Sequence, residues 1–211
     1  MSKKNDAGAL VILKKLKKNY PDAKSALDFS DPVQLLIATI LSAQCTDARV
    51  NIVTQTLFKK YKSPVDYLKV PVTELEKDIF STGFYRQKAK SIRACCAKLI
   101  ELYDAKVPAD FNKLNDLPGV GRKTASVVAG NAFGIPAIAV DTHVKRLSNL
   151  FGWSKSDNPD KIEEDLKQII PQKDWIVVGH LIATHGRATC VARSPKCNDC
   201  FLADDCPSAN I

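Results

Sequence analysis

The stretch LPGVGRKTA, residues 117–125, places two glycines just before a lysine at the expected start of a helix. Glycine is used where the backbone needs a positive φ or must approach a ligand closely, and the first N–H groups of a helix point outward unpaired. Such a turn can hold an anion. A Walker loop would need glycine at Arg122, and a dinucleotide fingerprint would need a third glycine at Thr124. Lys123 therefore needs another explanation.

The composition is that of a basic globular protein. The 211 residues are 45% apolar, which is enough for one large or two small domains with cores of their own. The net charge of +8 favours a polyanionic partner, although many basic proteins bind none. There is no apolar run of roughly 18 residues, and the N-terminal segment resembles neither a secretory signal nor a transit peptide. A cytoplasmic protein with no membrane partner is expected.

Helical periodicity dominates the chain, and capping signals mark several helix starts. Asp31-Pro32, Thr46 and Ser63-Pro64 each precede a segment with apolar residues on one face. The remaining periodic segments predict helices over 85–103, 122–133, 142–150, 159–170 and 173–184. The only strand-like piece is IPAIAV, residues 135–140, which is short and flanked by helices. The predicted fold class is all-α, and the short connections favour a compact protein.

The expected helix over 85–103 has an apolar face and a basic face. Its apolar positions point inward and leave four basic residues for solvent or phosphate, namely Arg86, Lys88, Lys90 and Arg93. A charge run of this kind is usually a solvated helix face, so phosphate binding is the less common of the two interpretations.

The seven cysteines fall into two groups. Cys45, Cys95 and Cys96 lie in helical patterns and are interpreted as small buried hydrophobic residues. The others follow the spacing C-x6-C-x2-C-x5-C, as Cys190, Cys197, Cys200 and Cys206. An odd total without a signal sequence indicates reduced thiols, and hence a metal centre instead of disulfides. Zinc fingers separate two cysteine pairs by about a dozen residues or more, so a cubane iron–sulfur cluster in one wrapped loop fits better.

Taken together, these motifs resemble the endonuclease III family within the helix-hairpin-helix superfamily of DNA glycosylases. The resemblance rests on LPGVGRKTA, VDTHVKRL (140–147), HGRATC (185–190), LLIATILSAQCTD (35–47) and TGFYRQKA (82–89). Each motif is moderately specific, and their shared order and spacing make the match specific. The resemblance implies a six-helix barrel domain over 25–135 and an iron–sulfur domain formed by 1–24 and 136–211. It also implies a DNA-binding cleft between the domains and a 4Fe-4S cluster on the four clustered cysteines.

The resemblance further implies a reaction. The family consists of bifunctional DNA glycosylases and AP lyases of base excision repair, which remove oxidised pyrimidines from duplex DNA and cleave the strand by β-elimination. The expected partner is duplex DNA with damaged pyrimidines or abasic sites, and the expected state is a monomer at the nucleoid of a prokaryotic cytoplasm. Lys123 matches the family's Schiff-base lysine. The positive end of a helix dipole, with Arg122 beside it, disfavours the ammonium form of this amine. The plain alternative is a surface lysine.

Three further positions match family residues around the lysine. Asp141 matches an aspartate that can stabilise the cationic sugar and move protons near the amine, and it equally fits a helix N-cap. The backbone N–H groups at Gly119 and Gly121 are expected to approach a DNA phosphate, which sets register without sequence preference.

Other candidate DNA contacts lie outside the hairpin. Gln44 and Phe84 match positions that fill the space left by a flipped base, although a helix-end role for Gln44 and a core role for Phe84 remain open. An aliphatic residue is common where Phe84 stands. His143 matches a histidine near the active site and equally fits a structural histidine. Arg193 and Lys196, in the cysteine loop, are expected to contact phosphate.

Two other functions remain open. An adenine-mismatch glycosylase would share the cluster and the hairpin, but such relatives lack lysine at the position of Lys123 and carry an extra C-terminal domain. This sequence has the lysine and runs only five residues past Cys206. A noncatalytic iron–sulfur DNA-binding protein would have no need for both Lys123 and Asp141.

Overall fold

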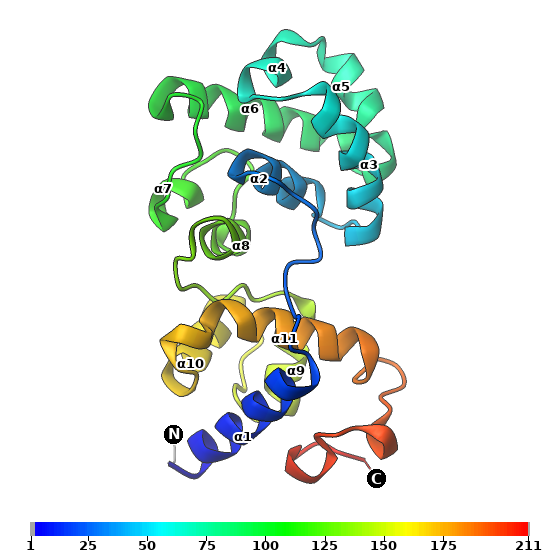
Figure 1. Ribbon diagram of the computed structural model, residues 1–211, viewed down its shortest axis with the longest axis vertical. Helices are drawn as coiled ribbons and strands as arrows, with labels where there is room; N and C mark the ends of the chain where they lie inside the picture. The colour runs from blue at the N-terminus through cyan, green and yellow to red at the C-terminus, as the bar shows by residue number, and fades with distance from the viewer. Residues whose placement is uncertain (1–2, 211) are drawn as a thin grey trace. The chain divides into compact units, whose positions relative to one another are not determined.

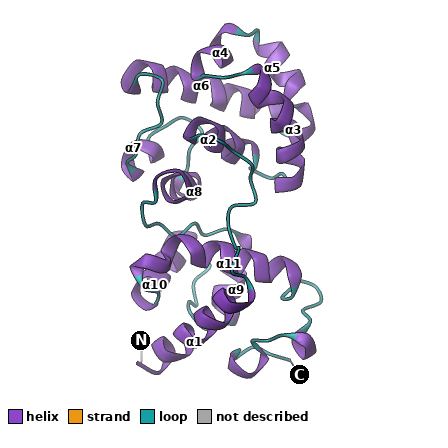
Figure 2. Ribbon diagram, in the orientation of Figure 1, coloured by secondary structure: helices purple, strands orange, loops and turns teal. Residues whose placement is uncertain are grey.

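The computed structural model describes residues 3–210 and builds them entirely from helices, turns and irregular connections, as the all-α prediction requires (Figures 1 and 2). The chain divides into two compact units, Ser25–Ile135 and Met1–Lys24 with Pro136–Ile211. Residues 135–140, the strand-like piece of the sequence, form no strand, because no strand lies within the described residues to pair with them. This segment instead leads irregularly from one unit into the other.

In the unit Ser25–Ile135, most helices begin at a side-chain cap. Its elements are α2 (Pro32–Leu41), α3 (Asp47–Lys60), α4 (Pro64–Lys69), α5 (Val72–Asp78), the 3-10 turn η1 (Phe80–Thr82), α6 (Tyr85–Tyr103), α7 (Phe111–Asn115) and α8 (Arg122–Phe133). Asp31 accepts a hydrogen bond from Gln34 N, and Thr46 accepts one from Arg49 N. Ser63 forms a capping box at the start of α4. The three predicted caps are confirmed.

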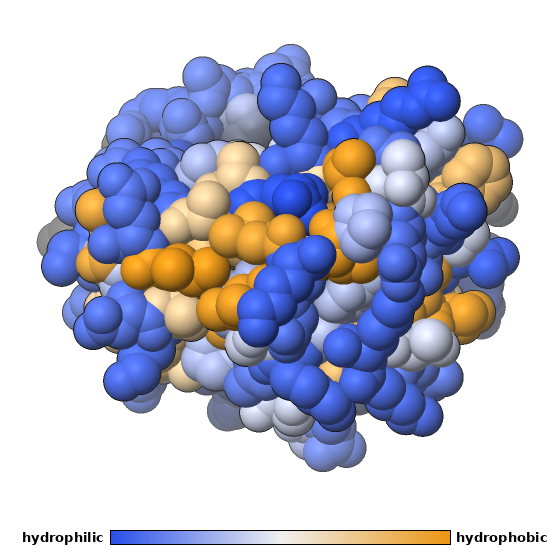
Figure 3. Space-filling model, turned by 90° about the horizontal axis from the view of Figure 1, so that it is seen from above, coloured by the Kyte–Doolittle hydropathy of each residue, from blue (hydrophilic) through white to orange (hydrophobic). Residues whose placement is uncertain are grey.

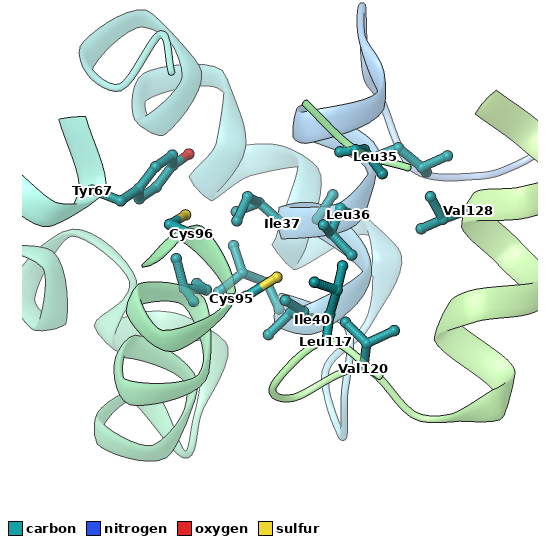
Figure 4. Close-up of a cluster of buried hydrophobic side chains, with 14 of the residues drawn as sticks. Leu35, Leu36, Ile37, Ile40, Tyr67, Cys95, Cys96, Leu117, Val120 and Val128 are labelled. Atoms are coloured by element: carbon teal, nitrogen blue, oxygen red, sulfur yellow. The ribbon is translucent and has the colours of Figure 1, made fainter. Parts of the chain in front are cut away.

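Helix α2 lies at the centre of this unit, packed against α3, α6 and α8. Every residue from Leu35 to Leu41 is buried, which is why α2 has no polar face. Figure 4 shows Leu36 and Ile40 of α2 close to Leu117 and Val120, the two apolar residues of the hairpin before α8. The core therefore anchors the hairpin directly. Cys95 and Cys96 of α6 are buried as predicted, whereas Cys45 is only half-buried.

The second unit has its own core. Its elements are α1 (Lys3–Asn19), α9 (Thr142–Leu150), α10 (Pro159–Ile169), η2 (Gln172–Asp174), α11 (Trp175–Ala188), η3 (Cys197–Asp199) and η4 (Ala203–Asp205). Leu16, Leu147, Leu166 and Leu181 are fully buried and bring α1, α9, α10 and α11 together. The helix predicted at 173–184 begins two residues later and continues four residues further, into the segment that precedes the cysteine loop.

Two basic residues of α6 that the sequence left for solvent or phosphate bind backbone carbonyls, with Lys88 buried and Arg93 half-buried. Lys88 is 4% exposed, and its ammonium donates hydrogen bonds to two backbone carbonyls. The Arg93 guanidinium donates to the carbonyls of Tyr67, Leu68 and Val70 at the end of α4. The last carbonyls of a helix lack intrahelical partners, so these cations replace the missing donors. Arg86 and Lys90 are exposed, as predicted.

The face at the top of Figure 1 is largely hydrophilic and is crossed by a band of hydrophobic side chains (Figure 3).

None of the helices between residues 3 and 210 combines the length and apolar character needed to cross a bilayer.

Candidate functional site

The hairpin between α7 and α8 is anchored at its base and open at its tip. Leu117 and Val120 are 2% and 5% exposed, whereas Gly119 and Gly121 are exposed. Gly119 has a φ of +76°, and a Cβ atom there would lie 2.6 Å from Ser91 Cβ. Gly121 is the N-cap of α8 with a φ of −91°, and a Cβ there would meet no atom within 4 Å. Only Gly119 therefore requires glycine for steric reasons, while Gly121 leaves the first N–H groups of α8 uncovered.

Lys123 is the second residue of α8 and is exposed. It makes no hydrogen bond or ion pair with any residue that the structure describes. Its neighbour Arg122 has a different setting, because the guanidinium carbon lies 5.4 Å from the centroid of the Phe111 ring. This cation–π contact ties α7 to α8. The amine of Lys123 thus extends into solvent beside the positive end of α8, and Arg122 supports the hairpin as well as contributing charge.

Asp141 is the N-cap of α9. Its Oδ1 accepts a hydrogen bond from Val144 N at 2.8 Å, and the residue is half-buried. The capping role that the sequence suggested is present. An ionised carboxylate accepts through two oxygens, so the cap leaves acceptor capacity for a substrate or a proton donor.

Two histidines lie on the helices around Asp141. His143 packs tightly on α11, because a Cβ atom at Gly186 would lie 2.7 Å from His143 Nδ1. His180 was not singled out from the sequence. Burial lowers the pKa of His180, and the charge of Asp141 acts in the opposite direction, so the imidazole lies in the field of that carboxylate. The apolar run of α11 gave no sequence signal for this histidine.

Gln44 and Phe84 border one hollow of about 220 Å³, whose lining also includes Lys88, Ser91 and Gly119. Both residues have left-handed backbones, with φ values of +53° and +48°. Phe84 is 64% exposed, so the core role considered for it is wrong. The left-handed backbones and the exposed aromatic ring beside a hollow make this surface a candidate site.

The cysteine loop surrounds a smaller cavity of about 80 Å³. All four predicted cysteines line it, namely Cys190, Cys197, Cys200 and Cys206. Within residues 8–210, no three side chains of His, Cys, Asp or Glu are grouped tightly enough to hold a single metal ion. In a cubane cluster each thiolate binds a different iron, so four cysteines spread around a cavity fit that group better than a lone zinc ion.

Hydrogen-bond donors lie close to two of these sulfur atoms. Arg146 Nη1 is 3.6 Å from Cys190 Sγ, and its Nη2 donates to the Cys190 carbonyl at 2.7 Å. The backbone N–H of Leu202 donates to Cys200 Sγ at 3.4 Å, and His185 Nε2 lies 3.7 Å from the same sulfur. Donors of this kind stabilise the negative charge that the thiolates of an iron–sulfur cluster carry.

The remaining candidates lie in the same loop. Arg193 and Lys196 are exposed, and the backbone N–H of Lys196 donates to the Thr189 carbonyl at 3.1 Å. A salt bridge from Lys15 to Asp205 ties α1 to η4. Arg193 and Lys196 therefore stand on a segment with a backbone hydrogen bond to Thr189 on one side and an ion pair at Asp205 on the other.

Comparison with known proteins identifies the family. Residues 37–172 match the HhH-GPD superfamily of base excision DNA repair proteins, and residues 190–206 match the iron–sulfur binding domain of endonuclease III. The chain is 51% identical to endonuclease III of Synechocystis sp. over 99% of its own length and 94% of that relative. The chain belongs to the endonuclease III family. It is also 41% identical to endonuclease III of Escherichia coli, with 96% of each chain covered.

Solved structures agree with this family. A trapped endonuclease III–DNA covalent intermediate in an estranged-adenine complex superimposes with a TM-score of 0.93 at 47% identity, covering 97% of this chain and 96% of that one. A thermostable thymine-DNA glycosylase superimposes with a TM-score of 0.88 at 26% identity and covers 97% of each chain. The helix-hairpin-helix glycosylase fold is thereby confirmed.

As a member of the endonuclease III family, the protein is a bifunctional DNA glycosylase and AP lyase of base excision repair, and it acts on DNA. It carries a 4Fe-4S cluster. The predicted enzyme class and cofactor are confirmed, which leaves the noncatalytic and adenine-mismatch alternatives without support. The named relatives are bacterial.

Proposed function

We propose that this protein removes oxidised pyrimidines from duplex DNA and cleaves the strand 3′ to the abasic site, with Lys123 as the nucleophile. The observation that carries the proposal is the position of Lys123. Its amine is exposed and without a partner among the described residues, directly after the phosphate-binding type of turn at Gly119 and Gly121. A backbone phosphate held by that turn would bring a sugar within reach of the amine.

The proposed chemistry starts with the neutral amine of Lys123. The amine attacks C1′ and forms a C–N bond while the bond from C1′ to the damaged base breaks, and the base leaves with a proton. The carboxylate of Asp141 stabilises the positive charge that develops on the sugar. The sugar ring opens to a Schiff base, loss of the C2′ proton eliminates the 3′ phosphate, and water then hydrolyses the imine to free the lysine.

The remaining site residues are proposed to position the DNA. The N–H groups at Gly119 and Gly121, with Arg122, would bind one phosphate, and Gln44 and Phe84 would fill the space of the extruded nucleotide. Three further side chains are proposed to contact the DNA, namely those of His143, Arg193 and Lys196. Cys190, Cys197, Cys200 and Cys206 are the proposed cluster ligands. The protein is proposed to act as a monomer at the nucleoid, in the cytoplasm of a prokaryotic cell, with no membrane partner.

Single-turnover kinetics on two duplexes test this proposal, one with thymine glycol and one with a pre-formed abasic site. Lys123→Gln removes the nucleophile at similar side-chain length, so both base release and strand cleavage should fall by orders of magnitude. Asp141→Asn should slow base release on the order of 10²-fold. It should slow cleavage at the abasic site less, because an abasic site needs no leaving base.

Equal losses for Asp141→Asn on the two duplexes would assign this aspartate to the amine or to the elimination step instead. Absence of thymine glycol excision by the wild-type protein, with cleavage of the abasic duplex intact, would overturn the substrate assignment.

A further inference from the structure

The side chain of Lys88, in the first turn of α6, connects two segments that line the hollow. These segments carry Gln44 and Phe84, the two residues with left-handed backbones. Phe84 is the N-cap of α6, and its carbonyl accepts a hydrogen bond from Lys88 N at 3.0 Å. The ammonium of Lys88 donates to the carbonyl of Leu41 at 2.7 Å and to that of Thr82 at 2.8 Å. Leu41 ends α2 three residues before Gln44, and Thr82 ends η1 two residues before Phe84. One amine therefore joins the loop of Gln44 to the loop of Phe84.

The burial of this amine makes the connection unusual. Lys88 is 4% exposed and forms no ion pair with any residue in the described part of the chain. Burial lowers the pKa of Lys88. A buried amine without a counter-ion is expensive compared with an apolar side chain of the same shape. Its two hydrogen bonds go to terminal carbonyls that would otherwise be buried without donors.

A third loop meets the same surface of α6. Ser91, one turn after Lys88, packs against Gly119 of the hairpin, and both residues line the hollow. Gln44 and Phe84 keep left-handed backbones that side chains disfavour, and such conformations persist only where the surroundings hold them. Lys88 supplies that support, because its ammonium donates hydrogen bonds to the carbonyls of Leu41 and Thr82, which lie shortly before Gln44 and Phe84.

We propose that Lys88 is a positioning residue for base extrusion, which fixes the separation of Gln44 and Phe84 so that both side chains can enter the space of the flipped nucleotide together. The proposal rests on the roles assigned to these two residues under the proposed function. Opening a paired base costs free energy that the inserted side chains must offset. Loss of the connection should therefore matter where a base pair must be opened and should matter little where the nucleotide is already unpaired.

The experiment compares thymine glycol in a fully paired duplex with the same lesion in a three-base bubble, under single-turnover conditions. Lys88→Met, which keeps length but removes the amine, should slow excision from the paired duplex about tenfold more than excision from the bubble. Arg93→Met is the matched control. Arg93 also leaves α6 to bind backbone carbonyls, but they belong to α4 and Arg93 does not line the hollow. Its loss should slow both substrates equally.

If Lys88→Met does not fold, the same paired-to-bubble ratio is measured in Lys88→Gln, whose shorter side chain cannot reach both carbonyls. A wild-type ratio in a folded Lys88 variant, or an equal change in Arg93→Met, would overturn the positioning role. Borohydride trapping of wild type on a pre-formed abasic site separates this inference from the proposed function. If wild type traps while the ratio stays unchanged, only the role of Lys88 fails, whereas loss of wild-type trapping would remove the proposed function itself.

Discussion

His185 Nε2 lies 3.7 Å from Cys200 Sγ, and this contact fixes the tautomer of a buried imidazole. A cluster-bound thiolate can only accept a hydrogen bond, so Nε2 carries the proton. Burial, with a smaller effect of Arg146, lowers the pKa of His185. In the neutral ring with its proton on Nε2, Nδ1 accepts a hydrogen bond from the hydroxyl of Tyr20, 3.1 Å away. A chain of hydrogen bonds thus runs from α1 to the cysteine loop.

These hydrogen bonds should influence the reduction potential of the cluster. Donors to cluster sulfur atoms favour the reduced, more negative cluster, so His185→Phe should shift the reduction potential to more negative values. A differential loss of about 0.5 to 1.5 kcal/mol for a one-electron couple corresponds to about 20 to 60 mV. Phenylalanine keeps the ring among Phe151 and Phe201, which surround His185. Protein-film voltammetry measures the shift. Tyr20→Phe should give a smaller shift in the same direction, and an unchanged potential in both variants would rule out the hydrogen-bond chain.

The assignment of the cluster ligands is tested by iron content. Cys197→Ser should lower the iron bound per chain below about four and weaken the broad visible absorption. Cys45→Ser is the matched control, because Cys45 is also a free, half-buried cysteine but lies outside the loop. It should retain full iron. Equal iron loss in the two variants would show that general instability, and not ligation, causes the loss.

The two hairpin glycines should differ in their effect on stability. Gly119→Ala forces a side chain into a left-handed conformation and against Ser91, so it should lower the free energy of unfolding by about 2 kcal/mol or more. Gly121→Ala meets open space and should cost about 1 kcal/mol or less through the weaker cap. Urea denaturation gives both values.

Gly121→Ala should also weaken binding to damaged and undamaged duplexes by similar factors, because a phosphate contact carries no base information. A loss confined to damaged DNA would make the hairpin part of base recognition. If Gly121→Ala destabilised the protein as much as Gly119→Ala, the steric account of the hairpin would be wrong.

Asp141 has a structural role that must be separated from its proposed catalytic one. Asp141→Asn keeps the cap of α9, since asparagine caps as well as aspartate, whereas Asp141→Ala should cost about 1 kcal/mol. Asn158→Ala removes the cap of α10 in the same unit and serves as the control. It should lower the unfolding free energy by a similar amount and leave base release unchanged. Slow base release in Asn158→Ala would mean that cap loss alone explains the Asp141 variants.

The helices were predictable because their signals are local. Asp31, Thr46 and Ser63 cap the residues that follow them, and the apolar period of α6 predicted both of its ends. Short apolar runs are ambiguous, which is why residues 135–140 suggested a strand. Without a neighbouring strand, that segment can only be an irregular connection.

The surroundings of the site residues were less predictable, because they depend on contacts between distant segments. Lys88 lies 47 residues from Leu41, to which it donates, and nothing in the local pattern of α6 distinguishes it from the exposed Lys90. His180 and His185 stand in an apolar helix whose sequence suggests only packing. The exposure of Phe84 follows from the turn that precedes α6, and an aromatic residue at a helix start fits the core equally well from sequence alone.

Peptide mapping of the trapped adduct identifies the amine that forms the covalent bond to the sugar, which we propose is that of Lys123. Wild-type protein is reduced with borohydride during its reaction with a duplex that carries thymine glycol, then digested and analysed by mass spectrometry. We expect a single modified peptide, with the deoxyribose remnant on the side chain of Lys123, and no adduct in Lys123→Gln. A remnant on any other lysine, or full trapping by Lys123→Gln, would contradict it.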